Sequence, residues 1–456
     1  MIDKIITIYI QKKTSLFHDQ YLILLSESMM KKGKIPANQP INLKFGTKSI
    51  YVKVLPSKRT NALIINELLA KNLGLHHKSK LRVRYSSSTL TIGPFIGVLL
   101  SHRTKQSPSK PFGSNTVFCQ ELSDASKLQG AFICFFTPND IHMDSNKIYG
   151  WTYYGGTWNK KSLPIPNAIY NRLSTRKQEN KSSVQHFMKE VKSKHHAQIF
   201  NEKFLDKTEV YDALSKNINL QKYLPESYSL KNYSMLKMMC SKYHTVFLKP
   251  SQGSLGRGII RVTRQSNGAY RCHFTNVNGS HSEKFSNLRK VYAKISGKLK
   301  TKRYQIQQGI PLIKVNQRPI DFRALVQKNL HGEWEITSIV GRIASNNHFV
   351  SNLARGGTLS SVKEALMKSN LPKHEVKNTI RRLHLSALKI AEGLEDQISN
   401  HFAELGVDLS IDVNGKVWMI EVNSKPSKND NTSLNENKIR PSVKKIIQYA
   451  RYLTFE

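Results

Sequence analysis

The chain has 456 residues, enough for two to four domains, and its 39% hydrophobic content is ordinary for a globular protein. Its charge is extreme, because 71 Lys and Arg residues face 31 Asp and Glu residues and give a formal net charge of +40. Such a charge attracts polyanionic partners, and a charge that only keeps the protein soluble or suits its compartment explains the composition equally well. No apolar run approaches about 18 residues, so the sequence predicts no membrane span, and four scattered cysteines without metal-ligand spacing indicate free thiols in a reducing cytoplasm.

Residues 1–95 contain an internal repeat. The segment 26–45 aligns with the segment 66–85 at a constant offset of 40 residues. Each copy is typical of a short helix, opened by Ser26 or Asn66 at the N-cap position, followed by a turn and an alternating strand. We predict a duplicated, β-rich, barrel-like module with pseudo-twofold symmetry, similar to double-psi barrels. It shows no catalytic constellation, so we expect it to bind or scaffold.

Residues 96–200 have the pattern of a small α/β domain. Continuous apolar runs at 92–100 and 130–136 predict buried strands of a parallel sheet, and the segment 150–158 predicts a hairpin. Asn171 and Arg172 follow a Pro-containing segment. A structural turn explains them better than substrate contact does.

The central stretch, residues 245–262, begins with an apolar strand that ends at Lys249. Three glycines follow, at positions 253, 256 and 258, and then a second strand begins. Glycine lets a backbone approach a phosphate closely, and a neighbouring lysine neutralises phosphate charge. The stretch is not a Walker loop or a dinucleotide fingerprint, since both motifs open a helix. A strand, a lysine, a glycine-rich loop and a second strand resemble the lid of an ATP-grasp enzyme, and the alternative is a glycine-rich surface hairpin.

Further along the chain, Tyr304–Gln308 is an alternating strand. Asp321 and Arg323 lie two residues apart in the next strand, which puts them on one face. The hairpin partner of that strand ends at Arg342. A loop at 351–357 follows, and the spacing of apolar residues predicts helices over 360–400.

Residues 407–423 predict a hairpin with two opposed carboxylates. Asn414-Gly415 is a strong turn signal, and a two-residue turn pairs Val413 with Lys416. In that register Asp408 lies opposite Glu421, and Asn423 lies two residues further on the same face. Oxygen ligands without Cys or His favour Mg²⁺ or Mn²⁺ between the carboxylates. A proton shared by the two acids or a solvated acidic edge are the alternatives. The opposite face, which we expect to be buried, consists of Val407, Leu409, Ile411, Trp418, Ile420 and Val422.

These motifs, in this order, resemble the ATP-grasp superfamily over residues 200–456, including ribosomal-protein glutamate ligases and D-alanine–D-alanine ligases. The whole layout, with the duplicated N-terminal module and the segments 92–97 and 201–207, resembles the YheC/YheD-type endospore coat-associated proteins. That resemblance implies a sporulating Firmicute, the mother-cell cytoplasm and a spore coat setting. The predicted fold class is mixed α/β (α+β): an N-terminal module at 1–95, a pre-ATP-grasp domain at 96–200, and an ATP-grasp domain at 201–456 with a lid at roughly 226–308.

The resemblance also implies a reaction. ATP and Mg²⁺ (or Mn²⁺) would activate an unidentified carboxylate as an acyl phosphate, which an unidentified amine attacks, and no covalent nucleophile is needed. The implied metal ligands are Asp408, Glu421 and Asn423, and the arginines for transferring phosphate or orienting a carboxylate are Arg323, Arg342 and Arg355. The implied ATP-binding residues are Lys207, Lys249, Ser251, Gly253, Ser254, Gly256, Gly258, Gln307, Gln308, Asp321 and Asn352.

Two other functions fit the sequence. A coat or assembly protein without turnover would use its basic surface to bind acidic coat proteins or polymers. The hypothesis that the chain binds nucleic acid depends on its charge alone, because no nucleic-acid-binding motif accompanies the charge.

Overall fold

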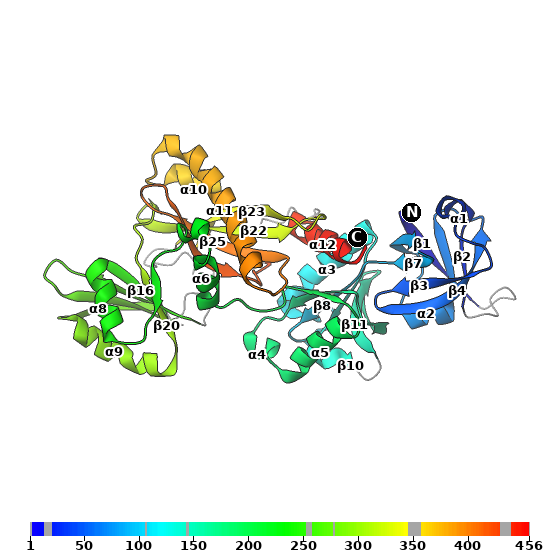
Figure 1. The fold of residues 1–456 in the computed structure, drawn as a ribbon, viewed down its shortest axis with the longest axis horizontal. Helices are drawn as coiled ribbons and strands as arrows, with labels where there is room; N and C mark the ends of the chain where they lie inside the picture. The colour runs from blue at the N-terminus through cyan, green and yellow to red at the C-terminus, as the bar shows by residue number, and fades with distance from the viewer. Residues whose placement is uncertain are drawn as a thin grey trace.

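The computed structural model describes residues 2–12, 21–104, 107–142, 146–251, 258–276, 279–344, 357–428 and 439–455. Four sheets follow one another along the long axis of the molecule (Figure 1). A closed barrel at the N-terminus forms one end, and a sheet covered by two helices forms the other. Within the described ranges, no helix combines the length and the apolar character needed to cross a membrane.

The N-terminal sheet is a closed barrel in the order β1-β5-β2-β4-β3-β7-β6. Its interior is filled by apolar side chains that alternate along the strands, as the pleat requires. The barrel confirms the predicted barrel-like module. Its elements are β1 (Ile2–Gln11), β2 (Leu22–Ser26), α1 (Glu27–Gly33), β3 (Pro40–Phe45), β4 (Lys48–Ser57), β5 (Ala62–Asn66), α2 (Glu67–Leu73), β6 (Ser79–Ser86) and β7 (Thr89–Ile92).

The repeat of 40 residues is visible in the barrel. Helices α1 and α2 begin 40 residues apart, and the equivalent strands β2 and β5 pair antiparallel with Leu24 opposite Ile64. Equivalent residues that face each other are what a twofold axis between the copies produces. Asn66 caps α2 by accepting a hydrogen bond from the N–H of Leu69 at 2.7 Å. Ser26 stands at the N-cap position of α1, but its side chain makes no capping hydrogen bond, and its hydroxyl lies 2.9 Å from that of Ser28 instead.

The second sheet has the order β10-β11-β9-β8-β13-β14, with β12 paired to β11. The predicted runs form β8 and β9, every residue of which is buried, and these strands and β13 pair in parallel. The elements are β8 (Phe95–Leu100), α3 (Thr116–Gln129), β9 (Phe132–Phe136), β10 (Ile141–His142), β11 (Lys147–Tyr154), β12 (Thr157–Pro164), β13 (Ala168–Arg172), α4 (Arg176–Glu179), α5 (Ser182–Ser193) and β14 (Gln198–Phe200).

Asn171 and Arg172, at the end of β13, hold the second sheet to its neighbours. Asn171 is fully buried and donates to the Glu202 carbonyl at 2.9 Å, while Arg172 donates to the Pro426 carbonyl at 3.0 Å. Both contacts agree with the structural interpretation of this pair.

The third sheet, in the order β15-β20-β16-β17-β18-β19, is the segment predicted to be the lid, and α8 and α9 cover one of its faces (Figure 1). Val246, Leu248 and Ile306 point into the core beneath these helices. The elements are β15 (Ser227–Ser229), α8 (Tyr233–Lys242), β16 (Thr245–Pro250), β17 (Ile260–Arg264), β18 (Tyr270–Asn276), β19 (Gly279–Phe285), α9 (Leu288–Thr301) and β20 (Tyr304–Gln308).

The fourth sheet, in the order β24-β23-β22-β25-β26 with β21 paired to β22, packs against the long helix α11 and carries the three predicted metal ligands together with Asp321, Arg323 and Arg342. The elements of this part are α6 (Lys207–Ser215), α7 (Ile218–Gln221), β21 (Lys314–Val315), β22 (Arg318–Lys328), β23 (Trp334–Ile343), β24 (Thr358–Ser361), α10 (Val362–Lys368), α11 (Val376–Gln397), β25 (Glu404–Ile411) and β26 (Val417–Asn423).

The last helix, α12 (Pro441–Phe455), leaves the fourth sheet and packs on α3 of the second. Arg440, just before it, forms a two-nitrogen contact with Glu121, including Nη2–Oε2 at 2.6 Å. The second and fourth sheets are therefore joined through a shared core. A buried carboxylate, Glu404, adds to this junction by accepting from the Tyr170 hydroxyl at 2.8 Å and from Gln327 at 2.8 Å.

Candidate nucleotide and metal site

Lys249 lies at the end of β16, on the face of the lid sheet that turns away from the lid helices. Alternation along the strand places Phe247 on the same face, whereas Leu248 is buried in the lid core. The ammonium group donates to Oε1 of Gln307 on β20. Gln307 is itself buried and donates to the Ser227 hydroxyl at 2.9 Å, so β15 and β20 hold the partner of the lysine in place.

The pKa of Lys249 is lowered to about 8. Burial is the main cause, the nearby charge of Lys207 lowers it further, and Glu421 acts in the opposite direction. Lys249 from the lid, Lys207 from α6 and Glu421 from β26 therefore lie within reach of one another's charge. An anionic ligand would stabilise the charged form of such a lysine strongly, because it offsets both the cost of burying the ammonium group and the repulsion from the second cation.

Lys207 is the first residue of α6, after the N-cap residue Asp206, and its ammonium lies 3.3 Å from Oε1 of Glu421. Both side chains keep some exposure, at 19% for Lys207 and 28% for Glu421. The structure thus brings both predicted phosphate lysines to one predicted metal ligand.

The hairpin of β25 and β26, which was predicted to hold a metal ion, has the predicted central pair but a different turn. Asp408 lies opposite Glu421 on β25 and β26, as the sequence predicts. The predicted pairing of Val413 with Lys416 is wrong. Instead Asp412 closes the turn: its backbone N–H donates to the Lys416 carbonyl at 3.0 Å, and its carboxylate accepts the N–H groups of Asn414 and Lys416 at 2.9 and 3.0 Å. An Asp side chain that collects turn N–H groups in this way lengthens the loop to three residues.

A bulge beyond Asp408 compensates for the longer turn. Leu409 pairs with Met419, so one residue of β26 is extra, and the register returns at Asp408. The bulge also changes which side chains face the core. Met419 and Val417 join Val407, Leu409, Ile411 and Val422 there, while Ile420, which was predicted to be buried, is half-buried. Trp418 is buried elsewhere, with its indole N–H donating to Asp412 Oδ2 at 2.9 Å.

Asp408 is the centre of a buried cluster of two arginines and two aspartates. Arg323, opposite it on β22, donates to both carboxylate oxygens, with Nη2–Oδ2 at 2.9 Å, and Arg342 Nη2 lies 3.0 Å from Oδ1. Arg342 also donates to Asp321, its direct neighbour on β22. Burial alone would raise the pKa of Asp408, but the two guanidinium groups outweigh it and hold that pKa below its ordinary value. Asp408 is therefore ionised at neutral pH.

Three oxygen-bearing side chains that were predicted as metal ligands lie at one end of this hairpin, although both carboxylate oxygens of Asp408 already accept hydrogen bonds from arginines. Asp408 and Glu421 are opposed on one face, and Asn423 lies next to them, opposite Gly406. A Cβ added at Gly406 would meet Pro426 Cβ at 2.9 Å and Arg323 Nη1 at 3.4 Å, so glycine lets both side chains pack close to the strand at this end of the cluster. Among the described residues no three His, Cys, Asp or Glu side chains gather around one point, so two carboxylates and an amide would leave positions for phosphate and water oxygens.

The remaining predicted residues divide into three groups. Gly258 has φ of +73° and donates its N–H to the Thr275 carbonyl at 3.1 Å, and the N–H of Ser251 donates to the Arg303 carbonyl at 2.9 Å. Gln308 turns to the backbone, since its side chain accepts from the Glu226 N–H at 3.1 Å. The other five predicted residues, Gly253, Ser254, Gly256, Asn352 and Arg355, lie outside the described residues.

Sequence reasoning missed a basic cleft of about 1280 Å³ on the face of the lid sheet that carries Lys249. Phe247, next to Lys249 on the inner face of the lid, lines it, and the chain that leaves β20 at 309–312 forms its wall. No Asp or Glu occurs in the described lining. Its cationic side chains are Arg261, Arg271, Lys314, Arg318 and Lys368. The sequence pattern could have predicted one wall of the cleft, because Thr245, Phe247 and Lys249 alternate along one strand. The remaining lining residues come from five separate segments, whose proximity the sequence does not show.

The fold and this arrangement define the chain as an ATP-grasp protein. A family model described as YheC/D-like ATP-grasp matches residues 196–453. The endospore coat-associated protein YheD of Bacillus subtilis is 30% identical over 412 residues, which cover 90% of each chain. YheC of the same organism is 24% identical over 315 residues, covering 68% of this chain and 85% of its own. The chain belongs to the YheC/YheD-like ATP-grasp family.

Among solved structures, the chain is similar to the D-alanyl-alanine synthetase A of Vibrio cholerae, with 12% sequence identity and a TM-score of 0.44. The match covers 79% of this chain and 98% of that one.

Proposed function

We propose that this protein binds ATP with Mg²⁺ or Mn²⁺ at the cluster around Lys249 and Glu421 and acts as an ADP-forming carboxylate–amine ligase. The observation that carries the proposal is the convergence of Lys249, Lys207 and Glu421 from three separate elements beside the Asp408–Glu421 pair. Two cations next to two carboxylate side chains suit a phosphate chain that shares a divalent ion with the protein.

In the proposed reaction a carboxylate oxygen of the substrate attacks the γ-phosphorus of ATP, the bond from that phosphorus to the β,γ-bridging oxygen breaks, and ADP leaves. The amine nitrogen then attacks the acyl carbon of the acyl phosphate. The bond from that carbon to the oxygen it shares with the phosphorus breaks, phosphate departs with that oxygen, and the amine loses a proton to solvent. Lys249 and Lys207 hold the phosphates, and the basic cleft accepts the rest of the nucleotide. Asp408, Glu421 and Asn423 would hold the metal ion, which supplies charge neutralisation on the phosphates.

The predicted arginines need a separate role. Arg323 is engaged by Asp408, and Arg342 is engaged by both Asp321 and Asp408. We propose that their first task is to orient Asp408 and keep it ionised, and that their contact with transferring phosphate follows from a rearrangement on binding. Arg355, outside the described residues, keeps its predicted role as a proposal.

Calorimetric titration with ATP tests the proposal, using the wild-type chain and Glu421→Gln with and without Mg²⁺. We expect binding that needs the metal ion and is at least about tenfold weaker in the variant, because a metal ligand has lost its charge. Absence of binding with Mg²⁺ and with Mn²⁺ would contradict the proposal and favour a coat or assembly protein without turnover.

A second titration uses the lowered pKa of Lys249. The lysine is charged below its pKa of about 8 and neutral above it, so phosphate binding gains from its charge up to about pH 8 and loses that gain at higher pH. We expect the dissociation constant for ATP to rise by up to about tenfold per pH unit above that value. Lys249→Arg, whose guanidinium stays charged, should abolish the rise. An affinity of the wild type that stays constant to pH 9.5 would show that Lys249 does not bind the phosphates.

The setting is a further proposal. The relatives that cover most of the chain are named endospore coat-associated proteins, and we propose the same association for this chain, with a mother-cell cytoplasmic origin. Its net charge of +40 suits acidic coat proteins or polymers as partners.

A further inference from the structure

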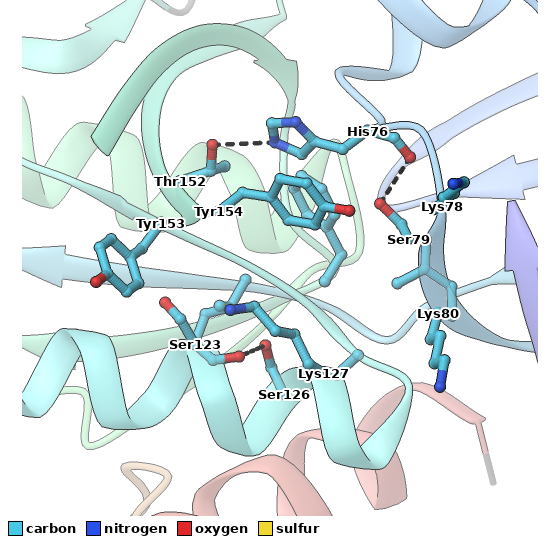
Figure 2. A pocket seen from close by; sticks show the side chains of 14 residues that line it. His76, Lys78, Ser79, Lys80, Ser123, Ser126, Lys127, Thr152, Tyr153 and Tyr154 are labelled. Carbon is cyan, nitrogen blue, oxygen red and sulfur yellow. Dashed lines mark hydrogen bonds between the residues drawn. The ribbon is translucent and has the colours of Figure 1, made fainter. Parts of the chain in front are cut away.

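A cavity of about 210 Å³ lies between the N-terminal barrel and the second sheet (Figure 2). All of its lining residues precede the candidate nucleotide site in the sequence. Four elements form its walls: the start of β6, helix α3, the start of β9 and the end of β11. Its lining residues are His76, Lys78, Ser79, Lys80, Leu81, Ser123, Ser126, Lys127, Ala131, Phe132, Ile133, Thr152, Tyr153 and Tyr154.

One wall is a fixed aromatic pair. The rings of His76 and Tyr154 stack with centroids 4.6 Å apart and an angle of 9° between their planes. His76 Nε2 lies 3.2 Å from the Thr152 hydroxyl, and its Nδ1 lies 3.2 Å from the Lys161 ammonium. Burial, and then the charge of Lys161, lowers the pKa of His76 to about 4, so the ring is neutral and its Nδ1 accepts a hydrogen bond from the Lys161 ammonium. This wall is therefore rigid and uncharged.

The rim of the cavity is cationic. Lys78, Lys80 and Lys127 are exposed at the rim (Figure 2), and the described lining contains no Asp or Glu. Lys127 makes one exposed ion pair, with Asp124 at 2.9 Å, which solvent screens.

The floor carries buried serine hydroxyls. Ser79 donates to the His76 carbonyl at 2.7 Å, Ser126 to that of Ser123 at 2.7 Å, and Ser123 to that of Cys119 at 2.9 Å. Their hydrogens are used, so their lone pairs are left to accept hydrogen bonds from a ligand.

Two strand edges also open into the cavity. On β6, Arg82 turns its N–H and C=O away from β1, donating to the Gly130 carbonyl at 2.7 Å and accepting from the Gly93 N–H at 3.0 Å. Lys80, two residues earlier, directs its peptide groups to the same side, where the pairing with β7 has not yet begun, since it starts at Val83.

The edge of β9 is open in the same way. Strand β11 pairs with β9 at Trp151–Phe135 and diverges from it beyond that pair. Phe132 donates its N–H toward β8, to the Pro94 carbonyl at 2.8 Å, so Ile133 directs its peptide groups to the opposite side, where β11 has separated.

From these features we propose that the cavity is a docking site for an extended acidic peptide segment of a partner protein. Strand edges at Lys80 and Ile133 supply backbone hydrogen bonds, as in recognition by strand addition. The lysines of the rim bind the carboxylates, and the His76–Tyr154 wall supports the chain. A small acid would use the lysines alone, whereas the open edges and serine acceptors match the N–H and C=O groups that every peptide carries. The proposal is independent of ATP binding.

Fluorescence anisotropy of a labelled hexaglutamate peptide, titrated with the full-length chain at physiological ionic strength, tests the site. We expect Lys80→Gln/Lys127→Gln to bind at least about tenfold more weakly, because two charge-assisted contacts are lost. The matched control, Lys44→Gln/Lys189→Gln, removes the same charge from exposed positions of the same two parts of the chain and should stay within about twofold of wild type.

A second peptide separates recognition of the backbone from attraction by charge. Hexaglutamate that is N-methylated at alternate residues keeps every carboxylate but loses half of its N–H donors, and we expect binding to weaken about fivefold. If Lys80→Gln/Lys127→Gln and the control Lys44→Gln/Lys189→Gln weaken peptide binding equally, the binding comes from the net positive charge of the whole protein, and the proposal is overturned. Binding that is unaffected by N-methylation would overturn the proposal too. So would an oligonucleotide that binds more tightly than hexaglutamate and loses the same fraction of its affinity in Lys80→Gln/Lys127→Gln.

Discussion

Glu421→Gln should lower ADP formation by about a thousandfold or more while the melting temperature stays within about 2 °C of wild type. Glu421 is the one predicted metal ligand that combines partial exposure, at 28%, with an ion pair to a lysine that is itself partly exposed. Its amide keeps the shape and one acceptor oxygen but loses the charge that a divalent ion and the lysines require. The fold loses little, because a half-exposed ion pair contributes little to stability.

The measurement is coupled ADP release, in the presence of a mixture of amino acids and acidic peptides that supports turnover by the wild type. Glu209→Gln is the matched control, since Glu209 also pairs with a lysine, Lys203, and is 35% exposed. That control should keep wild-type turnover. A Glu421→Gln protein that retains a tenth of wild-type activity would show that the metal is held elsewhere.

The hairpin shows how far the sequence can predict such a site. Asn414-Gly415 located the turn, and the alternation on either side placed Asp408 opposite Glu421, which the structure confirms. The turn itself was wrong by one residue, because Asp412 takes the N–H groups of the turn, and a bulge at the other end restored the register. Periodicity cannot detect two opposite shifts, since neither changes the residue types around the acids.

The barrel was easier to predict, because a repeat encodes it. An offset of 40 residues fixes which elements are equivalent, and equivalent elements of a closed, twofold structure must meet, as Leu24 and Ile64 do. The strand order of the barrel did not follow from the sequence. Closure through β7 depends on its pairing with both β3 and β6, and a strand of four residues gives no signal of its partners.

Contacts between distant segments were out of reach. Arg323 and Asp408 are separated by 85 residues, and Tyr170 and Glu404 by 234. A sequence shows that each residue is charged or polar, but a buried partner is specified by sheet order and helix packing. For this reason Arg323 and Arg342 were predicted to contact transferring phosphate or to orient a carboxylate, while the structure shows them paired with aspartates. Their role toward phosphate stays a prediction.

Asp408→Ala should lower the stability of the ATP-grasp part by about 3–5 kcal/mol, the opposite of the behaviour expected for Glu421. The carboxylate is 8% exposed and accepts from Arg323 and Arg342, which are 12% and 9% exposed. Its removal leaves two buried guanidinium groups with one remaining carboxylate, Asp321. We expect a fall in melting temperature of about 10 °C, measured by calorimetry, for a part of the chain of this size.

Two further variants identify the cause of that loss. Asp124→Ala breaks an exposed ion pair whose side chains are 43% and 53% exposed, and it should cost less than about 1 kcal/mol. Asp408→Leu combined with Arg323→Met removes a buried pair together and leaves Arg342 with Asp321, so it should regain most of the lost stability. If the double variant is as unstable as Asp408→Ala, the loss comes from packing and not from uncompensated charge. The same comparison matters for function, because a variant of Asp408 confounds loss of metal with loss of fold. Turnover in Glu421→Gln is therefore the cleaner measure of the proposed metal site.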